Sequence, residues 1–297
     1  MKPQDVAAYL FLALAWGLSF LVLLKVVHAF GWVGAVTFRS LLAGSTLIVA
    51  AAVLRRRLDF SVGWQPFATV GASTVAAQLI GLSYATPLIG TAMAAILVAT
   101  IPLFSMIISQ FWGLERISAA RLGGLLLGFL GIVLLVGFPA VPATGQFIFG
   151  CLCSLFSSFA AAFGSNYASH RLKATSSWEV TAGSFLFGGL MTLPLLIAVP
   201  VPSLPGPIDY LYLLILGGGM SALTYVTYFR LVSRIGATRA ISVEFAVTFV
   251  AMVVGAILLD ETLSATQIVG AAIIVLGCSL VLGLLPGTVL RAGRKSA

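Results

Sequence analysis

Four polar side chains in the apolar stretch 208–230 share one helical face. Ser221, Thr224, Tyr225 and Tyr228 follow the spacing i, i+3, i+4 and i+7. Two phenol rings and two hydroxyls can stack on an organic solute and hydrogen-bond to its ammonium or carboxylate group. The same groups can also serve only to join neighbouring helices, because hydroxyls commonly bond across helices in apolar surroundings. We rank this face as the first candidate for a binding surface and keep helix association as the alternative.

Two other stretches present aromatic rings beside small polar groups. Trp16 and Ser19 share one helical face, and Phe163, Asn166 and Tyr167 share another, 147 residues further along the chain. A site between the two faces would have aromatic walls and a few hydrogen-bonding groups, which is the profile of a small-ligand pocket. Close packing between helices is the alternative for both faces.

Two ionisable residues and one amide lie inside apolar stretches. Glu244 is the most deeply placed acid, and it could bind a substrate ammonium, carry a proton, or be a paired structural carboxylate. Arg39 could supply a cation to a substrate carboxylate, but we favour a side chain that extends to the lipid headgroups. Gln78 lies one helical turn from Thr74 and ranks below the first candidate face.

The composition indicates whether these residues lie in water or in a lipid bilayer. The chain has 297 residues, of which 60% are hydrophobic and 8% charged. Soluble domains are about 45–50% apolar and about 25% charged. The chain is therefore expected to be an all-α membrane protein, with ten runs of roughly the 20 residues that cross a bilayer. The runs are 6–27, 32–54, 65–85, 88–112, 119–138, 145–169, 178–200, 208–230, 238–259 and 264–285.

The sequence lacks the motifs of several classes of enzymes and nucleotide-binding proteins. The sequence has no Gly-x-Ser-x-Gly elbow, His-Glu-x-x-His pair or Walker loop, and only two histidines. Cys151, Cys153 and Cys278 lie in apolar runs without metal-site spacing. We therefore predict no catalytic residues, no metal and no cofactor. The net charge of +8 is not gathered with aromatics on a soluble surface, so we expect no nucleic-acid partner.

The basic residues predict the orientation. Lys and Arg are retained on the cytoplasmic side of membrane proteins. With a cytoplasmic N-terminus, 14 of the 16 Lys and Arg fall on the cytoplasmic side, and only Lys25 and Arg39 do not. We expect a multi-pass protein of a cell membrane, the inner membrane if the cell is bacterial, with both termini in the cytoplasm.

An internal repeat divides the chain. Glu-Arg-Ile-Ser-Ala at 115–119 recurs as Glu-Thr-Leu-Ser-Ala at 261–265, an offset of 146. Glycines follow at the same offset: Gly124, Gly131 and Gly137, then Gly270, Gly277 and Gly283. Each copy holds five runs, and an odd number inverts the second copy in the membrane, as in many secondary transporters. We predict two inverted repeats, at 1–141 and 142–297.

These motifs carry a family resemblance. The acidic residue with its glycine ladder in each copy, and Trp-Gly-Leu-Ser-Phe at 16–20, resemble the EamA family of the drug/metabolite transporter superfamily. Residues 228–237, Tyr-Phe-Arg-Leu-Val-Ser-Arg-Ile-Gly-Ala, are similar to YddG-type amino-acid exporters. The resemblance spans almost the whole chain and implies export of small metabolites by two five-helix units. One departure is Thr248, which stands where the first copy has Pro102.

The sequence thus predicts a secondary transporter, an exporter that works by alternating access around a midplane cavity. Phenols, hydroxyls and few charges favour amino acids of broad specificity as substrates. Efflux of drugs or other metabolites is the first alternative, followed by a non-transporting membrane subunit or a membrane-embedded enzyme. We expect a monomer in the lipid bilayer, without an obligatory protein partner. The predicted substrate-binding residues are Trp16, Ser19, Gln78, Asn166, Tyr167, Ser221, Thr224, Tyr225, Tyr228 and Glu244.

Overall fold

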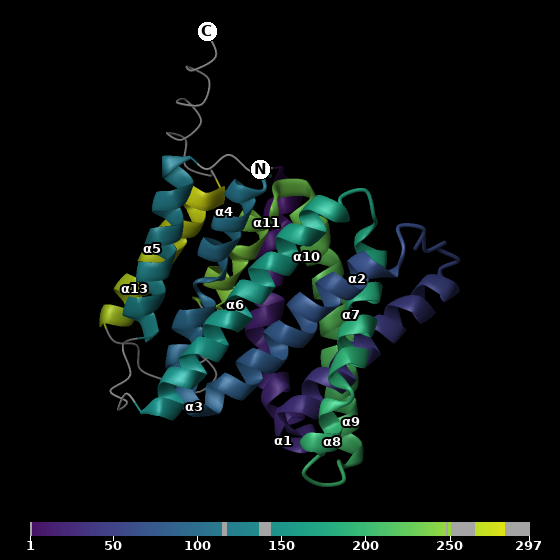
Figure 1. The fold of residues 1–297 in the computed structure, drawn as a ribbon. Helices are drawn as coiled ribbons and strands as arrows, with labels where there is room; N and C mark the ends of the chain where they lie inside the picture. Colours follow the sequence, from purple (N-terminus) through teal and green to yellow (C-terminus); the bar gives the residue numbers. More distant parts are fainter. Residues whose placement is uncertain (1, 115–117, 137–143, 248, 251–264, 283–297) are drawn as a thin grey trace.

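The computed structural model describes residues 2–114, 118–136, 144–247, 249–250 and 265–282, and the elements in these ranges are all helical (Figure 1). Five helical stretches are long and apolar enough to cross a membrane, and three shorter ones are apolar. The prediction of an all-α membrane protein is confirmed at this level. The long stretches are Lys25–Val53, Trp64–Thr86, Gly145–Arg171, Ser177–Ala198 and Pro207–Ile235.

Helix α1 (Pro3–Val53) contains a sharp break at Gly31. This glycine has φ +71° and ψ 169°, a conformation that side chains with a Cβ rarely adopt. The break divides α1 into two arms that correspond to the predicted runs 6–27 and 32–54. Figure 1 shows the second arm leaving in a new direction from the end of the first. Residues of both arms can therefore face one interior.

The next apolar run contains a π-helix. It consists of α2 (Trp64–Val70), η1 (Gly71–Ala77) and α3 (Gln78–Val98). The apolar span ends at Thr86, near the predicted boundary, but α3 continues to Val98. A turn at 99–100 then leads to α4 (Ile101–Phe111), where Pro102 occupies the first turn, a position that tolerates proline.

Helices α5 (Ala119–Val136) and α13 (Ala265–Leu282) pack along their glycines. A Cβ on Gly124 would lie 2.8 Å from the Gly277 carbonyl oxygen, and one on Gly131 would lie 2.8 Å from that of Gly270. Early positions of one helix face late positions of the other, so the two helices run in opposite directions. Small residues let the backbones approach closely, as in many membrane helix pairs.

The second half of the chain begins with two capped helices. The Thr144 hydroxyl accepts a hydrogen bond from the Phe147 backbone N–H at the start of α6, and Ser176 accepts one from Trp178 at the start of α7. A second π-helix then precedes α10. The elements are α6 (Gly145–Arg171), α7 (Ser177–Thr192), α8 (Leu195–Ala198), α9 (Pro207–Leu214), η2 (Ile215–Ser221), α10 (Ala222–Ile235) and α11 (Ala237–Ile241).

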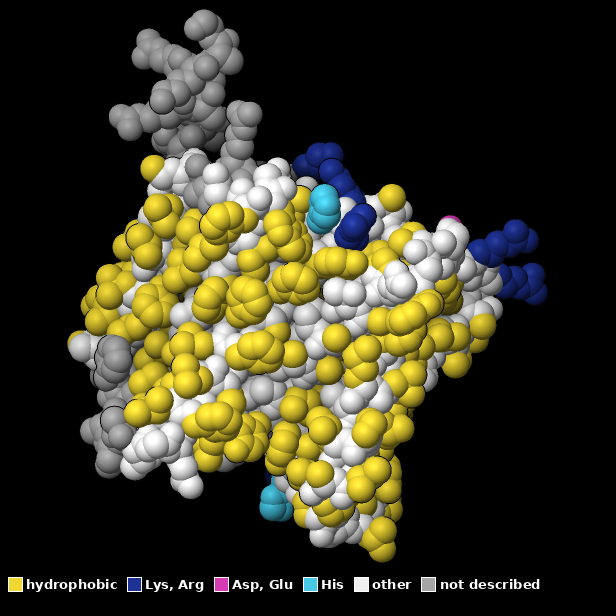
Figure 2. All heavy atoms as spheres, viewed as in Figure 1, with side chains coloured by type: hydrophobic (Ala, Val, Ile, Leu, Met, Phe, Trp, Pro, Cys, Tyr) yellow, Lys and Arg dark blue, Asp and Glu magenta, His cyan; other side chains and the backbone are white. Residues whose placement is uncertain are grey.

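Large apolar side chains cover the flanks of the bundle, while basic side chains gather toward one end (Figure 2). Leu126 and Leu130 on α5, for example, are 52% and 46% exposed. Such an apolar surface is stable only in lipid, so the chain is a multi-pass membrane protein. The Glu115 and Glu261 segments of the repeat, together with Gly137, Gly283 and Thr248, lie outside the described residues.

Candidate binding cavity

A cavity of about 130 Å³ lies between both arms of α1, the junction of η1 and α3, the junction of η2 and α10, and residues 243–247. Its volume is that of about four water molecules in the liquid. Seven of the ten predicted site residues line this cavity, so the structure brings together residues that are far apart in the chain. These are Trp16, Ser19, Gln78, Ser221, Thr224, Tyr225 and Glu244.

Trp16 and α10 form the aromatic wall of the cavity. The Trp16 indole N–H donates a hydrogen bond of 2.8 Å to the Thr224 hydroxyl. Its ring centroid lies 5.4 Å from that of Tyr225 and 5.5 Å from that of Tyr228, within the range of favourable aromatic contacts. Phe185 packs edge-on against Tyr225 with centroids 4.6 Å apart. This wall therefore lines the cavity and joins helices at the same time.

Local backbone bonds orient the small hydroxyls. Ser19 donates to the Trp16 carbonyl at 2.7 Å, and Ser221 donates to the Leu216 carbonyl at 2.7 Å. The second bond spans five residues, which matches the wider winding of η2. Because their protons are used internally, both hydroxyls offer lone pairs as acceptors. Donors on a solute are therefore the natural partners of this part of the wall.

Two opposite charges face the same cavity. Arg39 comes from the second arm of α1, and Glu244 from the helical residues that follow α11. The Arg39 Nε atom is buried and has no hydrogen-bond partner among the described residues. The Tyr225 hydroxyl is close enough to interact electrostatically with both charges. The favoured interpretation of Arg39 as a headgroup-seeking side chain is wrong, because its helical face packs inward, with Gly217 against its backbone.

Tyr228 lies where the cavity narrows. Its hydroxyl is 2.8 Å from the Ser165 hydroxyl, and its ring is buried. Beyond this constriction a space of about 10 Å³ remains, lined in part by Thr74, Ala161 and Ile241. Sequence reasoning missed Ser165, although it is the small polar neighbour of Asn166 on α6.

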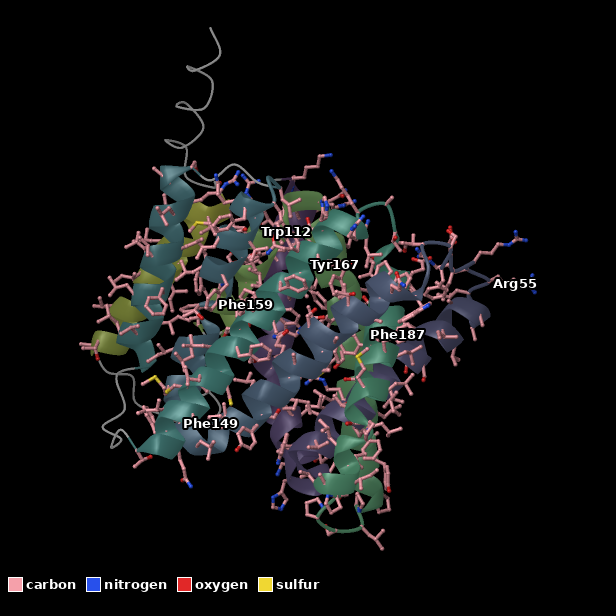
Figure 3. The ribbon with its side chains drawn as sticks, in the orientation of Figure 1. Arg55, Trp112, Phe149, Phe159, Tyr167 and Phe187 are labelled. Carbon is pink, nitrogen blue, oxygen red and sulfur yellow. The ribbon has the colours of Figure 1, made fainter. Side chains whose placement is uncertain are left out.

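Asn166 and Tyr167 do not line the cavity. The Asn166 side chain is fully buried, donates to the Ser105 hydroxyl at 2.9 Å and to the Ala162 carbonyl at 2.8 Å, and accepts a hydrogen bond from Ser109. Both N–H groups of its amide and one lone pair of its oxygen are therefore engaged within the protein. Tyr167 stacks on Phe163 with centroids 6.0 Å apart. Figure 3 shows Tyr167 and Phe159 on the visible face of α6, beside Trp112.

A network of hydroxyls surrounds Asn166. The Ser105 and Ser109 hydroxyls each lie 3.3 Å from that of Thr238, so the cluster connects α4, α6 and α11. Repeat alignment predicted the face of α6 only approximately: the residue that reaches the cavity region is Ser165, one position earlier. The sequence signal that could have identified this cluster is the pair of serines one helical turn apart on α4.

Within the described ranges, no three histidine, cysteine or acidic side chains come together as a metal site would require. The cavity instead offers a guanidinium, a carboxylate, hydroxyls, an amide and aromatic faces. This set can hold an organic solute reversibly by ion pairing, hydrogen bonds and stacking.

Comparisons with known proteins identify the family to which the chain belongs. The sequence matches the EamA-like transporter family over residues 6–137 and 148–283. It is 24% identical over 267 residues to an uncharacterized transporter of Archaeoglobus fulgidus, covering 90% of this chain and 94% of that protein. It is 26% identical over 288 residues to the protein PecM of Dickeya dadantii, covering 92% and 90%.

A Bacillus subtilis relative, the uncharacterized transporter YoaV, is 25% identical over 198 residues, which is 66% of this chain and 68% of that protein. A crystal structure that is 20% identical superimposes with a TM-score of 0.80 and covers 96% of this chain and 99% of its own, so the fold has an experimental counterpart. The prediction that the protein is not an enzyme is confirmed, because the matching family is a transporter family and the Archaeoglobus fulgidus and Bacillus subtilis relatives are named transporters. The chain belongs to the EamA-like transporter family.

Proposed function

We propose that this transporter exports zwitterionic amino acids of broad specificity. The observation that carries the proposal is the meeting of Arg39 and Glu244 at one small cavity, with Tyr225 close to both. An amino acid has a carboxylate that suits the guanidinium and an ammonium that suits the carboxylate. The aromatic wall formed by Trp16 and Tyr225 then accommodates side chains of varied shape.

Inverted repeats are part of this proposal. In the contacts between α5 and α13, Gly124 meets Gly277 and Gly131 meets Gly270, so the glycines related by the offset of 146 positions pair in opposite order. The antiparallel contacts between their glycines are those that a two-fold axis in the membrane plane would produce. The two π-helices, Gly71–Ala77 and Ile215–Ser221, begin 144 positions apart, and each leads directly into residues that line the cavity. Such irregular turns are frequent at functional sites.

Alternating access gives these parts a mechanism. The Asn166 network and the Ser165–Tyr228 bond lie on one side of the cavity and tie helices together. Their rupture would open the cavity toward that end. We assign this end to the cytoplasm because the basic residues gather there, which puts the N- and C-termini inside the cell. A monomer in the inner membrane of a bacterial cell, without a further protein partner, fits this arrangement.

Efflux of neutral drugs or other metabolites is the second candidate, and the aromatic wall supports it. The two candidates differ in one respect. Neutral solutes would use the rings and hydroxyls, whereas amino acids would need both charges.

The experiment is a titration of purified protein with three ligands. Leucine carries both charges, leucinamide lacks the carboxylate, and N-acetylleucine lacks the ammonium. Arg39→Gln should weaken binding of leucine and N-acetylleucine by roughly 10- to 100-fold, since a hydrogen bond to a charged group contributes about 1.5–3 kcal/mol. Leucinamide binding should stay within about twofold, because it makes no such contact. Glu244→Gln should weaken leucine and leucinamide instead.

The matched control is Lys25→Gln, which removes an exposed cation from the same helix outside the cavity. It should leave all three titrations unchanged. Equal weakening of all three ligands by Arg39→Gln would contradict the proposed pairing, as would unchanged leucine binding in both cavity variants.

A further inference from the structure

A second hollow lies at the basic end of the bundle, away from the central cavity. It has a volume of about 460 Å³ and shares no residue with the cavity that Arg39 and Glu244 line. Figure 2 shows basic and histidine side chains gathered at this end. Five such residues line the hollow, and they come from α5, α6 and the turn that follows it, the end of α10, and α11: Arg121, His170, Lys173, Arg234 and Arg239.

Among the described residues, the charged side chains that line the hollow are all basic. None of the described residues that line it is a carboxylate. Asp5 approaches from α1 and pairs with Arg234 at 3.2 Å, but a guanidinium has five N–H donors and one carboxylate does not use them all. Arg121 and Arg239 make further interactions of their own, so the inference rests on His170, Lys173 and Arg234.

Helix ends alone do not account for this clustering. Basic residues in the last turn of a helix favourably face its negative dipole end, and His170 and Arg234 fulfil this role for α6 and α10. Arg121 lies instead in the first turn of α5, where a cation is unfavourable. Its side chain nonetheless contributes to the hollow. A concave, mostly polar surface that collects cations from four elements has the features of an anion site.

We propose that this hollow binds a phosphate group. Lys and Arg side chains donate charge-assisted hydrogen bonds to phosphate oxygens, and the Ser169 hydroxyl adds a further polar group to the lining. Basic pockets between membrane helices bind phospholipid headgroups on the cytoplasmic side. The phosphate can belong to an anionic lipid of the adjoining leaflet or to a free anion. Because the hollow joins α5 to α6, α10 and α11, an occupant would hold these elements together.

The test measures binding to the purified full chain and does not involve transport, so its failure leaves the amino-acid proposal untouched. One arm titrates inorganic phosphate. The other compares phosphatidylcholine vesicles with and without phosphatidylglycerol, and both read the midpoint of thermal unfolding. The variant Lys173→Gln/Arg234→Gln removes two of the cations on which the inference rests. The control Arg55→Gln/Arg57→Gln removes two exposed cations outside it, with the same change in net charge.

We expect at least one of the two probes to stabilise the wild type and the control. The hollow variant should need a concentration of that probe at least about tenfold higher for the same stabilisation, because the loss of a charge-assisted contact weakens binding by about this factor. Stabilisation by phosphatidylglycerol alone identifies a lipid headgroup, and stabilisation by inorganic phosphate identifies a free anion. Equal weakening in both double variants, or no stabilisation of the wild type by either probe, would overturn the proposal. Should the double variant fail to fold, Lys173→Gln alone changes an exposed side chain and provides the same comparison.

Discussion

Replacement of Asn166 by leucine distinguishes a residue that holds helices together from one that binds substrate. Leucine has the same number of side-chain heavy atoms and the same branch point as asparagine, although its methyl groups are bulkier, so the change removes the hydrogen bonds and keeps a branched side chain at this position. The lost contacts between helices are those from Asn166 to the Ser105 hydroxyl at 2.9 Å, to the Ser105 carbonyl at 3.3 Å, and from Ser109.

The magnitude follows from these three bonds. Hydrogen bonds between membrane helices contribute about 0.6 kcal/mol each on average, so the three together contribute about 2 kcal/mol. The serines can still bond to Thr238, at 3.3 Å from each, which reduces the loss. If the bonds form only while this end of the cavity is closed, Asn166→Leu favours the open arrangement by roughly 10- to 30-fold.

A cysteine at the constriction reports this shift. Ala161 is buried and lines the narrow space beside Tyr228, so its replacement by cysteine places a thiol there. Cys151, Cys153 and Cys278 are first changed to alanine. The rate of labelling by a soluble maleimide should rise about tenfold in the Asn166→Leu variant, following the shift estimated from the bonds. Leucine affinity should change by no more than about threefold, since the side chain makes no contact with the cavity.

The control is Ser154→Ala on the same helix. The Ser154 hydroxyl is buried and has no hydrogen-bond partner among the described residues, so its removal breaks no such bond. Labelling in this variant should match the parent. An unchanged labelling rate in Asn166→Leu, together with a tenfold loss of leucine affinity, would refute the reasoning and restore Asn166 to the substrate site.

Two further substitutions test packing and the aromatic wall. Gly277→Ala would place a Cβ 2.6 Å from the Gly128 backbone nitrogen, so it should destabilise the α5–α13 pair by about 1–3 kcal/mol and lower the thermal midpoint. The control Gly123→Ala meets no atom within 4 Å and should leave the midpoint unchanged. Equal midpoints for both variants would contradict this packing. Trp16→Phe keeps a ring but loses the 2.8 Å bond to Thr224, so leucine binding should weaken by roughly three- to tenfold, and an unchanged titration would remove that bond from the account.

Much of the fold could be predicted because lipid imposes simple rules on sequence. Apolar runs of membrane length, separated by charges and prolines, predicted most helix positions within a few residues. The continuation of α3 past Thr86 to Val98 could not be predicted from the apolar runs, because Pro87 indicates the end of a helix and tertiary packing overrides it. The π-helices were also outside sequence reasoning, because no local pattern distinguishes them from ordinary helix.

The cavity was predictable where one helix presents several polar groups. The face of α10 emerged from spacing alone, and a single carboxylate in an apolar run identified Glu244. Arg39 was assigned to the headgroups because sequence gives its depth but not the direction in which its helix turns after Gly31. The repeat relation to Trp16 and Ser19 predicts Asn166 in the site, but sequence cannot tell whether the amide bonds to a substrate or to the serines of α4.

The most direct test of the account is counterflow of radiolabelled leucine into liposomes that contain the purified chain. Liposomes loaded with unlabelled leucine should accumulate the label transiently. Other amino acids outside should compete, while leucinamide, N-acetylleucine and neutral drugs should compete poorly. If Arg39 and Glu244 hold the two charges of the substrate, the double variant Arg39→Gln/Glu244→Gln should fold but show no counterflow. Absence of counterflow with folded wild-type protein, or equal competition by a neutral drug, would contradict the claim that the cavity recognises zwitterions.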